Sequence, residues 1–148
     1  MGQLEHPAIP PAYLIGVGDD QGPILVMRWI RGVPWDEKLA ELASPEEDEL
    51  LKGAVLRSEL NSFVRICEAV AFSHSQGIIH RDIKPSNIMI GQYGEVYLLD
   101  WGISVELQED GVYDALGFAG TPCFAAPEML GREPKLDPRT DVYLLGST

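Results

Sequence analysis

The sequence feature that most constrains this chain is an octapeptide at residues 80–87, His-Arg-Asp-Ile-Lys-Pro-Ser-Asn. It places the carboxylate of Asp82, the amine of Lys84 and the amide of Asn87 in one short loop that directly precedes a predicted strand. Asp100 follows the predicted strand pair that comes next. A loop and a neighbouring hairpin can hold such groups rigidly, so we expect the four side chains to converge. An isolated aspartate is more often a turn or capping residue. The presence of Lys84, Asn87 and Asp100 near Asp82 argues against that interpretation.

Short apolar runs predict two β-hairpins. Residues 13–17 and 24–30 are rich in apolar and β-branched side chains and are separated by a polar turn at residues 18–22, which is typical of a hairpin. Strands at residues 88–90 and 96–99 follow the octapeptide. From Asp100 to about Pro127 the pattern is irregular.

Helices are expected at residues 35–42, at residues 56–76 and from Asp141 to the end of the sequence. Three- and four-residue spacings place six side chains on one face of the second helix, and these are Leu56, Leu60, Phe63, Cys67, Val70 and His74. Gly77 suits the left-handed position that closes a helix. The sequence therefore predicts a mixed α+β domain with a mainly helical core.

Charge and cysteine content narrow the classes of partner. The formal net charge of -12 argues against nucleic acid or an anionic membrane as the main partner, because a negative field repels phosphate. Cys67 and Cys123 lie far apart in sequence, which favours buried, reduced thiols over a disulfide framework or a zinc site. No stretch is long and apolar enough to span a membrane, and we expect a cytoplasmic location for this part of the protein.

Further motifs follow the octapeptide in a fixed order. They are Asp100-Trp101-Gly102, Gly120-Thr121-Pro122, Ala126-Pro127-Glu128 and Asp141-Val142-Tyr143. With them the chain resembles the eukaryotic-type serine/threonine protein kinase family in a bacterial style. The resemblance implies a truncated protein kinase-like fold over residues 1–148. Residues 1–30 would be a remnant of the N-lobe with the hinge strand, and residues 31–148 a portion of the C-lobe that ends within a helix.

The resemblance implies phosphoryl transfer from ATP, a reaction that depends on positioning and charge neutralisation. Asp82 would accept or orient the proton of the substrate hydroxyl, and Lys84 would neutralise charge on the transferring group. Asn87 and Asp100 would hold Mg²⁺, which prefers oxygen ligands. The substrates implied are serine and threonine side chains of proteins.

The resemblance also implies a nucleotide site. Met27 would border the pocket behind the adenine, the carbonyl of Arg28 and the N–H of Ile30 would bond its edge, and Met89 would form its floor. Ordinary core packing is the alternative for both methionines. Arg28 departs from the family, which usually has an acidic residue there.

Other family positions have structural or regulatory roles. His80 would be a packing residue, and Asp141 would accept backbone N–H bonds from the loop at residues 80–87. Glu128 would pair with an arginine that this chain lacks, and Thr121 would belong to the segment that binds the protein substrate. Arg81 matches the residue that in related kinases binds a phosphate on the activation segment, which we define here as residues 100–128.

The activation segment has an unusual composition. Residues 105–120 contain no serine or threonine, and Tyr113 is their only hydroxyl. Carboxylates are frequent there, namely Glu106, Glu109, Asp110 and Asp114. We expect activation without phosphorylation of the middle of this segment, with one of these carboxylates beside Arg81. Solvated loop charges are the alternative.

Three family parts are not found in the sequence: the glycine-rich phosphate loop, the lysine that follows it, and the helix that carries that lysine's glutamate. We therefore expect negligible kinase activity from this chain alone. Two other functions stay open. A non-catalytic kinase-like binding scaffold would explain the missing parts, and a small-molecule kinase of the aminoglycoside type shares the spacing from Asp82 to Asn87 but lacks the segment at residues 120–128.

Overall fold

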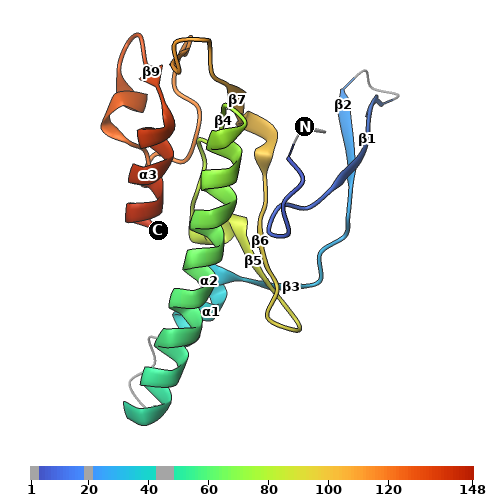
Figure 1. Cartoon of the computed structure of the whole chain (residues 1–148), viewed down its shortest axis with the longest axis vertical. Coiled ribbons are helices and arrows are strands. Elements are labelled where there is room, and N and C mark those ends of the chain that lie inside the picture. Colours follow the sequence, from blue (N-terminus) through green and yellow to red (C-terminus); the bar gives the residue numbers. More distant parts are fainter. Residues whose placement is uncertain (1–3, 19–21, 43–48) are drawn as a thin grey trace.

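One long helix, α2, forms the spine of the structure, a computed structural model that describes residues 4–18, 22–42 and 49–148 (Figure 1). The helices are α1 (Trp35–Leu42), α2 (Glu49–Ser75) and α3 (Pro138–Ser147), with short 3₁₀ turns at Pro85–Asn87, Trp101–Ile103 and Pro127–Leu130. The strands are β1 (Ala12–Val17), β2 (Pro23–Met27), β3 (Gly32–Pro34), β4 (Ile78–Ile79), β5 (Ile88–Gly91), β6 (Val96–Leu98), β7 (Val105–Glu106), β8 (Tyr113–Asp114) and β9 (Lys135–Leu136). The predicted mixed α+β class is confirmed.

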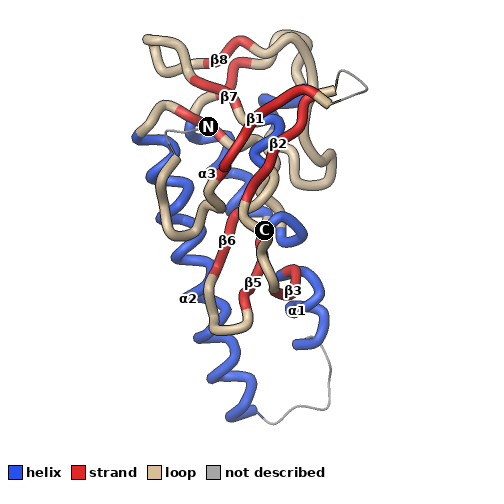
Figure 2. The backbone as a smooth tube through the Cα atoms, turned by 90° about the vertical axis from the view of Figure 1, so that its right-hand side faces the viewer, coloured by secondary structure: helices blue, strands red, loops and turns tan. Residues whose placement is uncertain are grey.

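The first hairpin pairs β1 with β2 antiparallel, with Leu14 opposite Val26 and Ile15 opposite Leu25. Its turn lies mostly outside the described residues. The predicted second strand is too long, since β2 ends at Met27 instead of residue 30. One further backbone bond, from Arg28 N to Pro11 O at 3.1 Å, closes the ribbon. Beyond it the chain must turn away to reach β3, which belongs to a different sheet (Figure 2).

The second hairpin is confirmed. Strand β5 pairs with β6 on one side and with β3 on the other, in the order β3-β5-β6. Ile88 and Ile90 of β5 are buried, as is Leu98 of β6, so the alternation of β5 directs its isoleucines into the core. The loop at residues 80–87 continues directly into β5 of this small sheet. The sheet therefore fixes the position of the C-terminal end of the octapeptide.

Helix α2 begins at Glu49, earlier than residue 56, and ends as predicted next to Gly77, whose φ is 71°. The predicted buried face is partly wrong, because Leu56 and Leu60 are 61% and 55% exposed. The predicted Val70 is buried, and the face that meets the core also carries Ser62, Ile66, Ala69 and Ser73, which were not predicted. Small side chains let the sheet approach closely, and a pattern that counts large apolar residues overlooks them.

The stretch after Asp100 is less irregular than expected. Strand β7 pairs with β4, and β8 pairs with β9, each over two residues. The last helix starts at Pro138, three residues before the predicted Asp141. Asp137 and Thr140 form a reciprocal capping box around that start, with proline in the first turn, a sequence signal for a helix N-terminus.

Both cysteines are free, as expected for reduced thiols, but the expectation of burial is wrong for Cys123, which is exposed, and Cys67 is only partly buried. In the described part of the chain, no helix is long and apolar enough to cross a membrane.

The corrected face of α2 yields a stability prediction. Ile66 is fully buried and Leu60 mostly exposed, so Ile66→Ala should lower the free energy of unfolding by about 2–5 kcal/mol through lost burial and a residual cavity. Leu60→Ala should change it by about 0.5 kcal/mol or less, as is usual at a surface position. Urea unfolding of the two variants measures the difference, and equal losses would contradict the observed face.

Candidate active site

The loop at residues 80–87 is held by a buried carboxylate. Asp141 of α3 has no exposed surface, and it accepts hydrogen bonds from His80 N at 2.7 Å and Arg81 N at 2.9 Å. The Nε2 atom of His74 in α2 lies 2.8 Å from the same carboxylate. Arg81 has a φ of 75°, a left-handed conformation that is costly for a residue with a side chain. These hydrogen bonds fix that conformation and join α2, α3 and the loop at one point.

His80 links this loop to the strand that leads to Asp100. The side chain is fully buried, its Nε2 lies 3.0 Å from the carbonyl oxygen of Leu99, and its Nδ1 accepts from Asp82 N at 3.2 Å. Burial lowers the pKa of His80 and outweighs the opposing field of Asp141 and the bond to Leu99. The two contacts fit a neutral ring with its proton on Nε2. The ring also packs edge-on against Trp101, with centroids 4.5 Å apart.

Asp82, Lys84, Asn87 and Thr121 form one hydrogen-bonded cluster. Lys84 Nζ donates to Asp82 Oδ2 at 2.7 Å and to Thr121 Oγ1 at 2.6 Å. Thr121 Oγ1 donates to Asp82 Oδ1 at 2.6 Å. Asn87 Nδ2 donates to the backbone oxygen of Asp82 at 2.8 Å and to its Oδ2 at 3.0 Å. Thr121 of the activation segment therefore joins the hydrogen-bonded group that Asp82, Lys84 and Asn87 form within the loop.

The cluster keeps Asp82 ionised at neutral pH. Burial alone would raise the pKa of this carboxyl, but hydrogen bonds from Lys84 and Thr121, the charge of Lys84 and the bond from Asn87 together lower it. The result is a nearly buried carboxylate that still meets a hydroxyl on its Oδ1. Such a group can orient a hydroxyl or accept its proton.

Gly120 allows the activation segment to come this close. Its φ is 137°, and a Cβ atom there would lie 2.9 Å from the backbone oxygen of Arg81 and 3.0 Å from Cε of Met129. The methionine end can move, but the backbone oxygen is fixed by the loop. Only glycine fits this position without displacing Thr121 from Asp82.

Asp100 lies apart from this cluster in its hydrogen bonding. It has a φ of 60°, its side chain is exposed, and within the described ranges it forms no hydrogen bond or ion pair with Asp82, Lys84 or Asn87. Asn87 uses its NH₂ group for Asp82, which leaves its amide oxygen as an acceptor. An amide oxygen and a free carboxylate are the kind of ligands that Mg²⁺ prefers, so the donor set fits that ion.

A cavity of about 140 Å³ adjoins Asp100. Its wall is mostly apolar and includes Met27 and Leu25 of β2 together with Asp100, Trp101 and Gly102. Met89, predicted as the floor of the nucleotide site, is half-buried in β5 and does not line this cavity. Met27, the other predicted methionine, lines this cavity together with Asp100.

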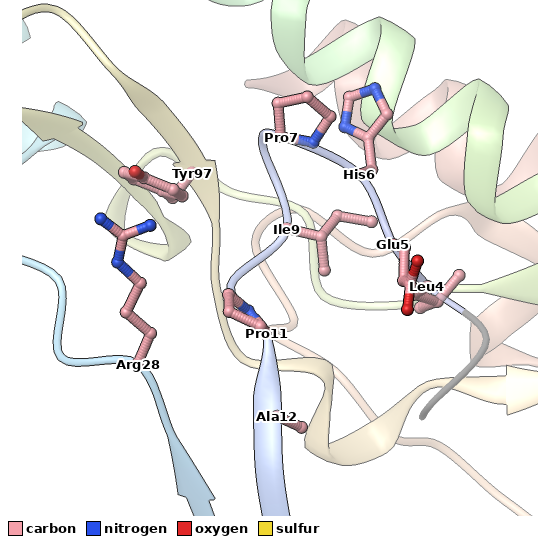
Figure 3. A pocket seen from close by; sticks show the side chains of 9 residues that line it. All are labelled: Leu4, Glu5, His6, Pro7, Ile9, Pro11, Ala12, Arg28 and Tyr97. Carbon is pink, nitrogen blue, oxygen red and sulfur yellow. The ribbon is translucent and has the colours of Figure 1, made fainter.

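The predicted hinge residues have unequal surroundings. Arg28 N already donates to Pro11 O, whereas Ile30 is half-buried and lies outside any strand. The Arg28 side chain lines a second cavity of about 390 Å³, together with Tyr97, His6, Pro7 and five other residues (Figure 3). Neither Asp82 nor Thr121 lines it, so this cavity is separate from the polar cluster.

Two expectations for the activation segment change. No carboxylate of the described residues lies within ion-pair distance of Arg81, and the guanidinium instead lies over the ring of Tyr113, 5.6 Å from its centroid. Glu128 accepts a hydrogen bond from Thr140 Oγ1 at 2.8 Å. Thr140 and His74 are thus partners that the motifs did not identify. The capping-box pattern of Asp137 and Thr140 is the sequence signal that could have identified Thr140.

Comparisons with known proteins identify related sequences. The family model described as the protein kinase domain matches residues 4–148. The serine/threonine-protein kinase PknD of Protochlamydia amoebophila (strain UWE25) is 33% identical over 165 aligned positions, which cover 97% of this chain and 16% of that protein. The PknD proteins of Chlamydia muridarum and of Chlamydia trachomatis serovar D are 34% and 33% identical, again over 97% of this chain. The chain spans 16–18% of the length of these curated relatives.

Gly120 provides a direct test of the contact between the activation segment and the loop. Gly120→Ala should lower the free energy of unfolding by about 1–3 kcal/mol, because the new Cβ meets backbone in a conformation that suits glycine. The matched control is Gly117→Ala, where a Cβ meets nothing within 4 Å and the change should stay within about 1 kcal/mol. Thermal unfolding compares the two, and similar stabilities would argue against the close approach.

Proposed function

This chain belongs to the protein kinase domain family, and we propose that it carries the catalytic loop of a serine/threonine protein kinase that uses Mg-ATP. The observation that carries the proposal is the cluster of Asp82, Lys84, Asn87 and Thr121. It combines an ionised carboxylate, a cation and an amide at a point where a hydroxyl meets the carboxylate.

Asp82 is proposed to orient the substrate hydroxyl and accept its proton. The hydrogen bond from Thr121 Oγ1 to Asp82 Oδ1, at 2.6 Å, supports this role, because it is a hydroxyl donating to the same carboxylate oxygen. A pKa held below its ordinary value keeps the group able to accept. A substrate hydroxyl would take the position that Thr121 now occupies or share that oxygen with it.

Lys84 is proposed to neutralise charge on the transferring phosphoryl group. Its ammonium lies 2.7 Å from Asp82 Oδ2 and 2.6 Å from Thr121 Oγ1. It is therefore close to the carboxylate that would bind the substrate hydroxyl. Since phosphoryl transfer relies on electrostatic stabilisation, a fixed cation at this point is what the reaction needs.

Asn87 and Asp100 are proposed as the Mg²⁺ ligands. The ion would supply positive charge for the phosphates of ATP. The amide oxygen of Asn87 is directed by its bonds to Asp82, and the exposed carboxylate of Asp100 is held in a left-handed backbone conformation. His80 fixes the strand before Asp100 through Leu99, which keeps both candidate ligands on one rigid frame.

The nucleotide is proposed to lie near Met27, the backbone of Arg28 and Ile30, and Met89. The cavity between Met27 and Asp100 supports this location in part. In this proposal residues 1–30 form the end of an N-lobe with the hinge strand, and residues 31–148 form part of a C-lobe. Serine and threonine of proteins are the proposed acceptors, in line with the names of the relatives and with the pairing of Lys84 and Thr121.

The proposal is tested with two substitutions in the full-length protein. Asp82→Asn should lower kcat by at least about a hundredfold, a loss typical of a missing general base, with little change in ATP affinity. Asp100→Asn should lower the rate and also weaken Mg-ATP binding. Asp36→Asn, at an exposed position of α1, is the control and should have no effect. Steady-state transfer to a generic protein substrate and a nucleotide-binding titration supply both readouts.

The outcome also distinguishes the scaffold alternative. Rates within about tenfold of the parent for both variants, equivalent to ~1.4 kcal/mol, would show that the assigned roles are wrong. A parent protein that binds partners but transfers no phosphoryl group would favour a non-catalytic scaffold.

A further inference from the structure

Arg81 is a buried cation with an aromatic partner. Arg81 is only 6% exposed, and its guanidinium carbon lies 5.6 Å from the centroid of the Tyr113 ring. Its Nε atom is buried and has no hydrogen-bond partner in the described part of the chain. A cation within about 6 Å of a ring face is attracted by the ring's quadrupole. Tyr113 is therefore the group that compensates this charge.

The surrounding anions do not take this role. Glu106, Glu109, Asp110 and Asp114 are all exposed, and none lies within 4.0 Å of the Arg81 nitrogens in the described structure. Asp114 instead lies 4.0 Å from Lys135, an exposed pair of little energetic weight. Because residues 105–120 contain no serine or threonine, this stretch also lacks the usual serine or threonine acceptors of a phosphate. The ring of Tyr113 is what remains for Arg81.

Tyr113 is held on its other side by backbone pairing. In the β8–β9 ladder Tyr113 faces Leu136, which is buried, and Ala115 N donates to Pro134 O at 2.8 Å. Strand β9 leads within one residue to Asp137 and so into α3. The same helix carries Asp141, which binds Arg81 N. Arg81 is thus tied to α3 twice, through its own backbone and through the ring of Tyr113.

This double attachment bears on the polar cluster. The backbone oxygen of Arg81 is the atom against which Gly120 packs, and the next residue, Thr121, donates to Asp82. A shift of Arg81 would therefore move both the activation segment and the residue next to Asp82. The contact with Tyr113 stabilises the arrangement in which Asp82 and Thr121 meet.

We propose that Tyr113 is a positioning residue whose aromatic face replaces a phosphorylated side chain on Arg81, so that the activation segment is ordered without phosphorylation. This regulation rests on the proposed kinase function of the same site. It requires the ring and not the hydroxyl. The proposal replaces the expected carboxylate with a neutral group that is always present.

The substitutions separate the ring from the hydroxyl in the full-length protein. Tyr113→Leu should lower kcat/KM for the protein substrate by about three- to thirtyfold, the range that corresponds to losing a buried cation–π contact. The KM for ATP should stay within about twofold, because neither Arg81 nor Tyr113 lines the cavity beside Met27 and Asp100. Tyr113→Phe keeps the ring and should restore activity to within about twofold of the parent.

Two controls accompany these variants. Tyr93→Leu makes the same change at a tyrosine that is 86% exposed in the β5–β6 turn and should leave kcat/KM unchanged. Treatment of the parent with a phosphatase, verified by mass spectrometry, should also leave it unchanged. The proposal would be overturned if Tyr113→Phe lowered kcat/KM as much as Tyr113→Leu does. It would also be overturned if dephosphorylation of the parent abolished activity.

A measurement independent of activity separates this inference from the proposed function. Protease Glu-C cuts after Glu106 and Glu109, two exposed residues of the activation segment that precede residue 113 and are unchanged in the variants. Cleavage there should be at least about threefold faster in Tyr113→Leu than in the parent, since a lost contact of this size frees the segment, and unchanged in Tyr113→Phe. Equal cleavage in all three proteins would overturn the contact. If the parent transfers no phosphoryl group and Asp82→Asn changes nothing, the kinase proposal fails, while the cleavage rates still decide the role of Tyr113.

Discussion

The arrangement of the site depends on the buried carboxylate of Asp141. A carboxylate without exposed surface is costly unless hydrogen bonds compensate it, and here the donors are His80 N and Arg81 N, with the His74 ring at 2.8 Å. Two of these groups belong to the loop and one to α2, so forming the bonds brings three distant segments to one point. Loss of any partner would leave a buried charge or a buried N–H group unsatisfied. The backbone of the loop at residues 80–87 is therefore fixed independently of the side chains of Asp82, Lys84 and Asn87.

Two strained residues mark the ends of the region that this anchor fixes. Arg81 and Asp100 are the two residues other than glycine with positive φ in the described structure, and such conformations persist where surrounding contacts over-determine them. Asp141 holds the first. The second follows Leu99, whose carbonyl lies 3.0 Å from the ring of His80. Because His80 also accepts from Asp82 N, one buried imidazole fixes the spacing between the loop and the residue proposed to bind Mg²⁺.

The parts of the fold that could be predicted from sequence are those set by short-range chemistry. The octapeptide, the β5–β6 hairpin and the glycine that closes α2 each follow from neighbouring residues. The buried face of α2 did not, because Ser62, Ala69 and Ser73 are buried by the close approach of other elements and not by their own hydrophobicity. Thr121 donates to Asp82 and accepts from Lys84, and these bonds join residues 39 and 37 positions apart. Spacing along the chain could suggest these residues, but only the packing of Gly120 against Arg81 brings them together.

The cost of burying charge also explains why Tyr113, and not a carboxylate, lies beside Arg81. An ion pair inside a protein must recover the desolvation of two charges, whereas a ring face costs little to bury and still attracts a cation. The acidic residues of the segment keep their hydration by staying exposed, which suits a chain with a net charge of -12. A phosphate on this segment would have to compete with a contact that is already made and would add charge to an already acidic surface. A neutral aromatic partner thus gives Arg81 a fixed position, and it makes the order of the activation segment a property of the fold instead of a modification.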